Sequence, residues 1–122
     1  MNAPSSTRAR PLANGIANAI DVGVTDLIHS YQDVVRDPEG RKYAASAHAV
    51  QRIDGVWEAW IEFRGMGRGV TLRTGRESER ADHRAIMQWA ATLQPSYLDG
   101  ALLRATRVRL TQLRSLLEGR AA

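Results

Sequence analysis

The sequence predicts a single α+β domain, a four-stranded antiparallel β-meander followed by two C-terminal helices, with an N-terminal helix as an optional element. Two observations lead to this fold class. Between residues 31 and 74, β-prone stretches alternate with turn sequences, Asp-Pro-Glu-Gly at 37–40 and Asp-Gly at 54–55. From about residue 80, apolar residues recur every three or four positions, as on one face of a helix. The length of 122 residues fits one domain with its own core.

The N-terminal part is expected to hold a tail and one ambiguous segment. Residues 1–11 read as a disordered tail, because they contain Pro, Ser and Arg and no apolar run. The single domain then covers residues 12–122. In the segment 12–30, apolar residues at helical spacing favour a helix over much of its length. The alternation around Val22, together with Gly15 and Gly23, favours a strand instead.

Four stretches are expected to form the meander: 31–36, 42–52, 56–64 and 70–74. The third is the clearest, because Ala59, Ile61 and Phe63 alternate with polar residues and Trp60. The second is rich in alanine, a poor strand former, so its assignment depends on its neighbours. The Asp-Gly pair tolerates the positive φ that a tight hairpin requires.

Two helices are expected after the meander. The first covers 80–93, with Ser78 or Asp82 as its N-cap. The Gln-Pro-Ser sequence at 94–96 separates it from a second helix, which runs from about Ser96 to Glu118 and stops at Gly119. In this last helix, leucines recur every seven residues.

Charge and composition exclude several function classes. The chain has no cysteine, so thiol catalysis and cysteine-ligated metal sites are excluded. No apolar run reaches the ~18 residues of a membrane span. No apolar stretch follows the N-terminal arginines, so we expect no export signal and a cytoplasmic protein. Residues 1–63 carry 6 cations and 8 anions, whereas residues 64–122 carry 11 cations and 5 anions. A basic half of this kind indicates a polyanionic or acidic partner.

Nine arginines and one tryptophan are candidate nucleic-acid contacts. Phosphates require cations that lie together in space, and an outward-facing tryptophan can stack on a base. The candidates are Arg64, Arg68, Arg73, Arg76, Arg80, Arg84, Arg104, Arg107, Arg114 and Trp60. For the six arginines between residues 64 and 84, the alternative is a solvated face with ion pairs to Glu77, Glu79 and Asp82. The alternative for Trp60 is a sheet that is covered on both sides.

The last helix is expected to be basic and amphipathic. At 100° per residue, Arg104, Arg107 and Arg114 fall within a sector of about 80°, and the leucines lie on the other side. Such a helix could lie along phosphates, meet an acidic protein, touch an anionic membrane or be an ordinary surface helix. The residues expected to form an interface, with a second copy or with the N-terminal helix, are Leu103, Leu110, Leu113 and Leu117.

Catalysis is not expected. The three histidines show none of the close pairs of a metal site, and no nucleophile-elbow sequence is present. His83 beside Asp82 could act as a general base only if Ser78 or Thr74 converged on it. No catalytic residue, metal or cofactor is therefore assigned.

Part of the chain resembles a group of small bacterial proteins of no established function. The stretches that carry the similarity begin at Asp37, Trp57, Leu72 and Tyr97, and together they span 37–101. The resemblance covers about half the chain and implies a unit of hairpin and helix. It implies no activity, ligand or site.

The sequence thus favours a non-enzymatic binding protein that contacts nucleic acid or another polyanion through its arginine-rich C-terminal half. The alternative is a protein-interaction or assembly module, which associates with itself or docks onto a larger complex through the C-terminal leucine seam and Trp60.

Overall fold

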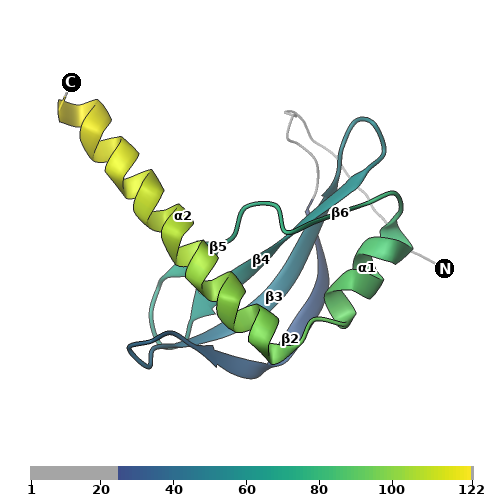
Figure 1. Ribbon diagram of the computed structural model, residues 1–122, viewed down its shortest axis with the longest axis horizontal. Helices are drawn as coiled ribbons and strands as arrows, with labels where there is room; N and C mark the ends of the chain where they lie inside the picture. The colour runs from purple at the N-terminus through teal and green to yellow at the C-terminus, as the bar shows by residue number, and fades with distance from the viewer. Residues whose placement is uncertain (1–24, 122) are drawn as a thin grey trace.

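The computed structural model describes residues 25–121, and the side chains of residues 25–119. The strands are β2 (Asp26–Arg36), β3 (Lys42–Gln51), β4 (Trp57–Gly65), β5 (Thr71–Arg73) and β6 (Ser78–Arg80), and the helices are α1 (His83–Ala91) and α2 (Pro95–Ala121) (Figure 1). The expected tail at 1–11, and all of the ambiguous segment up to residue 24, lie outside the described residues.

The sheet is an antiparallel meander in the order β2-β3-β4-β5. β3 and β4 pair along their whole length, from Tyr43 opposite Gly65 to Gln51 opposite Trp57. The other edge of β4 pairs with β5 at one end and with β6 at the other. Between them, the amides of Thr74 and Glu77 donate to carbonyls of β4 at 3.0 and 2.8 Å, so residues 71–80 form one interrupted strand.

The core lies between one face of this sheet and the helices. On the sheet side, Ala47, Ile61 and Phe63 are fully buried. On the helix side, Ile86 of α1 and Leu102 of α2 belong to the same apolar cluster. Ala45, Ala47 and Ala49 of β3 are buried in this cluster, and their burial offsets their poor strand propensity.

Side chains of aspartate fix the turns and the first helix start. Asp37 accepts hydrogen bonds from the amides of Glu39 and Arg41 at 3.0 and 2.9 Å, in the turn that Gly40 completes with φ +83°. Asp82 is the N-cap of α1 and accepts from the Ala85 amide at 2.8 Å. These are the residue types that turns and caps require.

The predicted fold class is confirmed, with three differences. Residues 26–30 are strand, so the helical interpretation is wrong for them. They pair with β3 from Asp26 opposite Ala49 onward, and irregular register near Ile28 disturbs the alternation. The second difference is the short edge strand β6: the first helix was expected from residue 80, but Arg80 pairs with β4 and α1 begins only at His83. The third is the end of the last helix, which was expected at Gly119 and continues to Ala121. A single glycine costs a helix only about 1 kcal/mol, so it need not end one.

α2 continues well past the sheet (Figure 1). Its 27 residues span about 40 Å at 1.5 Å per residue. Ala105 is the last buried residue among those of α2 whose side chains are described. We call residues 107–121 the outer half of α2.

Candidate functional site

Exposed leucines gather on α2. Half of the ten large apolar side chains that are exposed in the described residues belong to this helix. They are Leu103, Leu110, Leu113, Leu116 and Leu117, with exposed fractions between 43% and 65%. Contiguous exposed apolar surface of this kind marks interaction sites more often than scattered single residues do.

Four of these leucines form one seam. Leu103, Leu110 and Leu117 occupy position a of a heptad repeat, and Thr106 and Leu113 occupy position d. The Thr106 hydroxyl donates to the Leu102 carbonyl at 3.0 Å, so its polar group is satisfied within the helix. The seam residues therefore share a stripe about 80° wide, the width at which two helices pair.

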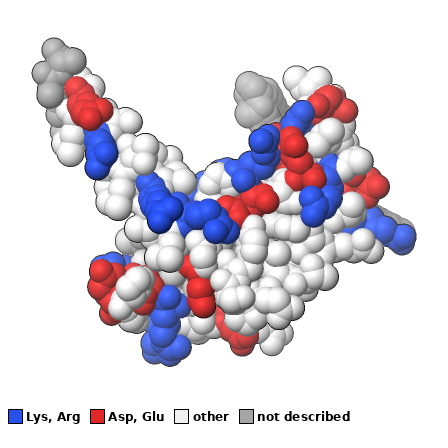
Figure 2. All heavy atoms as spheres, in the orientation of Figure 1, with Lys and Arg blue, Asp and Glu red and all other residues white. Residues whose placement is uncertain are grey.

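Arginines flank the seam on both sides. Arg107 and Arg114 occupy position e, and Arg109 occupies position g. All three are exposed, and none forms an ion pair with another residue between 25 and 119. Basic side chains of α2 are visible along the projecting helix (Figure 2). The outer half of α2 therefore combines an apolar stripe with positive edges.

The first half of α2 is held to the sheet by Glu77. The Arg104 guanidinium donates to both Glu77 carboxylate oxygens, at 2.9 and 2.7 Å, and the Tyr97 hydroxyl donates to the same carboxylate. The Glu77 side chain is only 8% exposed. Burial and then the Glu77 carboxylate raise the pKa of Tyr97 to about 12. Arg104 thus contributes to the fold, and its charge is offset by Glu77.

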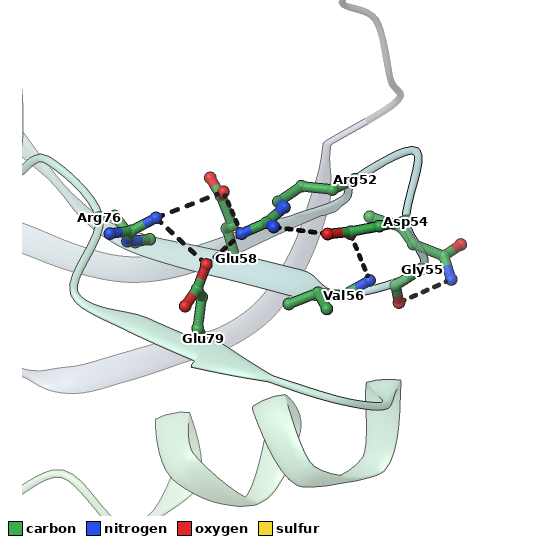
Figure 3. Close-up of polar contacts among 8 residues, drawn as sticks. Arg52, Asp54, Gly55, Val56, Glu58, Arg76 and Glu79 are labelled. Carbon is green, nitrogen blue, oxygen red and sulfur yellow. Dashed lines mark hydrogen bonds and ion pairs between the residues drawn. The ribbon is translucent and has the colours of Figure 1, made fainter.

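Arg76 also belongs to an ion-pair network. Its guanidinium lies 3.1 Å from Glu79 and 3.7 Å from Glu58 (Figure 3). Arg52 contacts the same two carboxylates and also Asp54, which lies 2.5 Å away. Opposite charges also lie close together over the body of the molecule (Figure 2). Three carboxylates therefore surround two arginines at this end of the sheet.

Trp60 is buried, with an exposed fraction of 6%. The Arg73 guanidinium carbon lies 4.2 Å from the centre of its ring, and the indole nitrogen donates to Glu62 at 3.1 Å. This burial does not fit the interpretation of Trp60 as an accessible stacking or docking group. The alternative of a sheet covered on both sides stays a prediction, because the expected N-terminal helix lies outside the described residues. Arg68 lies in a similar way over the Tyr43 ring, at 5.0 Å.

The remaining candidate arginines of the sheet and α1 are spread out. Arg64, Arg80 and Arg84 are exposed. Arg64 lies near the C-terminal end of β4, whereas Arg80 lies opposite Trp57 at its other end. Seven residues of strand separate these ends by roughly 23 Å. Phosphate contact by these arginines stays a prediction, and it would need a ligand long enough to reach both ends of β4.

The contacts of two histidines bear on the catalytic arrangements that the sequence analysis considered. The same His48 ring nitrogen, Nε2, faces Ser46 at 2.9 Å and Glu62 at 3.4 Å, whereas a catalytic relay uses the two ring nitrogens for the two partners. The Nε2 atom of His83 lies 3.5 Å from the Asp26 carboxylate. The Asp82 carboxylate caps α1 and does not serve to orient the His83 ring. No group of three metal-ligating side chains was found among the described residues.

Comparison with known proteins adds no assignment. No protein-family model, curated protein or solved structure matches the chain. The resemblance of residues 37–101 to small bacterial proteins stays a prediction. Among the described residues, neither helix is both long and apolar enough to cross a membrane.

The leucine repeat and the basic face could both be read from the sequence. The sequence did not show that Leu116 would also be exposed, or that Arg109 would flank the seam. Both follow from the heptad positions once α2 is known to leave the sheet after Ala105.

Proposed function

We propose that this chain is a non-enzymatic protein-interaction module that docks onto a partner through the outer half of α2. The observation that carries the proposal is the exposure of Leu110, Leu113, Leu116 and Leu117 on a helix that extends beyond the sheet. Burying one leucine side chain stabilises a complex by up to about 2 kcal/mol. A protein partner is the class of ligand that can cover several of them at once.

The arrangement of charge supports this function over polyanion binding. Arg76 and Arg104 are engaged by carboxylates, and Arg68 and Arg73 lie over aromatic rings. A phosphate backbone would also leave the leucines of α2 in water, where they gain nothing from the complex. Polyanion binding through the exposed arginines therefore has less support than protein docking.

Photo-crosslinking in the living cell tests this function. Leu113 is replaced by p-benzoylphenylalanine, and the same residue placed at Gln112 is the matched control. The two positions are adjacent, but about 100° apart on the helix, so only the first lies on the seam. We expect protein adducts from position 113 and few from position 112. Adding Leu117→Lys, one turn away, should abolish the adducts.

Three results would contradict the proposal. The first is the absence of adducts at position 113. The second is an equal adduct pattern at both positions, which would indicate random collision. The third is an adduct that nuclease digests, which would indicate that nucleic acid, and not protein, lies against α2.

A further inference from the structure

We propose that the partner presents an acidic amphipathic helix, which pairs with the seam of α2 and places carboxylates against Arg107, Arg109 and Arg114. This inference rests on the proposed function and adds the chemistry of the partner. Two features of the described residues carry it, namely the geometry of the seam and the sign of the charges on its edges.

The geometry favours a helix as the occupant. Seam positions alternate in steps of three and four, from Leu103 through Thr106, Leu110 and Leu113 to Leu117. This spacing matches knobs-into-holes packing between two helices. The seam covers about 21 Å of helix, and its first residue lies where α2 is still anchored by Leu102 and Ala105. A partner helix therefore meets a surface that is already ordered at one end.

The charges disfavour a second copy of this chain. In a parallel pair, position g faces position e of the next heptad of the other helix, so Arg109 of each copy would face Arg114 of the other. In an antiparallel pair, e faces e, which brings Arg107 of each copy against Arg114 of the other. Like charges in these positions are destabilising. Glutamates at the same positions of a partner turn each repulsion into an attraction.

An anionic membrane surface fits the helix less well. Helices that lie in a membrane interface present a broad apolar face, commonly with tryptophan or phenylalanine. The seam is narrow, and residues 103–119 contain no aromatic residue. Arg109 also lies between the seam and Leu116, so it interrupts the apolar surface on that side. A vesicle arm in the experiment checks this point.

The experiment measures binding of the full chain to a designed probe. The probe is a labelled three-heptad peptide with leucine at a and d and glutamate at e and g. Its matched control carries lysine at e and g. We expect the glutamate peptide to bind about tenfold tighter or more at low salt, because three flanking arginines change from repulsion to attraction. Added salt should reduce this difference, since these charges are exposed.

Variants of the chain locate the binding surface. The double substitution Arg107→Glu and Arg114→Glu should reverse the preference toward the lysine peptide. The substitution Leu113→Lys should remove binding of either peptide. The control Thr111→Lys adds the same charge outside the seam, so it should leave binding intact. Far-ultraviolet circular dichroism checks that each variant folds. We expect all of them to fold, because the substituted positions are exposed.

Each other outcome overturns the inference. Equal affinity for both peptides would show that the flanking charges do not select the partner. Binding of neither peptide, while crosslinks from position 113 persist, would overturn the acidic helix and leave the proposed function standing. A dimer by light scattering that Leu113→Lys dissociates would identify a second copy as the occupant. Binding to phosphatidylglycerol vesicles without peptide binding would identify a membrane.

Discussion

Two leucine-to-alanine substitutions separate the two halves of α2. Leu102 is 1% exposed and belongs to the apolar cluster between the helices and the sheet, whereas Leu110, two turns later, is 59% exposed. We expect Leu102→Ala to lower the free energy of unfolding by about 2–4 kcal/mol, from lost burial and the cavity it leaves. We expect Leu110→Ala to change it by less than about 0.5 kcal/mol, because an exposed helix position loses little packing.

Urea unfolding followed by circular dichroism measures both values. In a domain of this size, the loss at Leu102 corresponds to a fall in the thermal midpoint of roughly 10 °C or more. Helix propensity does not separate the two variants, because both make the same exchange within one helix. A loss of stability from Leu110→Ala as large as that from Leu102→Ala would contradict this difference between the two halves of α2. It would mean that the isolated chain already covers the outer half of α2.

Three further predictions concern the rest of the molecule. Hydrogen exchange should be fast at the amides of residues 107–119 and slow at those of residues 98–105, because a helix end of about 15 residues without packing is marginally stable. Equal protection of the amides in the two ranges would contradict this prediction. Glu77→Gln should lower the free energy of unfolding by about 1–3 kcal/mol, because it weakens the charged hydrogen bonds to Arg104 and Tyr97. Glu79→Gln should have a much smaller effect, which salt suppresses, because Glu79 belongs to an exposed network. Equal losses for the two variants in urea unfolding would contradict this prediction. The pKa of Tyr97 is raised from its ordinary 10.0 to about 12, so its contribution to stability is complete below pH 10 and is lost as the pH rises through 12. In urea unfolding, the free energy of unfolding should therefore fall less over this pH range in Tyr97→Phe than in the unaltered chain. An equal fall in both proteins would contradict this role of Tyr97.

The meander could be predicted because its turns carry their own chemistry. Asp37 and Gly40 fix one turn, and Asp54 and Gly55 fix the next, whatever packs nearby. Residues 26–30 were harder, because leucine and isoleucine at this spacing suit a helix or a strand, and pairing with β3 decides between them. β6 was missed because three polar residues carry no periodicity of their own.

The residues of the candidate site could be predicted from the sequence, but their contacts and burial could not. The leucine repeat and the basic edge are properties of one helix, so the sequence alone locates them. Whether an arginine is free depends on partners distant in sequence, such as Glu77 for Arg104, 27 residues away. The burial of Trp60 likewise depends on Arg73 in a neighbouring strand. Long-range contacts of this kind cannot be read from local spacing.

A single labelled cysteine gives the most direct test that the outer half of α2 is an open docking face. The chain has no cysteine of its own, so Leu113→Cys carries an environment-sensitive dye at one site only, and Gln112→Cys is the control. We expect a water-exposed dye in the free protein at every concentration. We also expect the dye to move to an apolar environment when the glutamate peptide is added, at position 113 and not at 112. A dye at position 113 that is already buried in the free protein, or that the peptide leaves in water, would contradict the account.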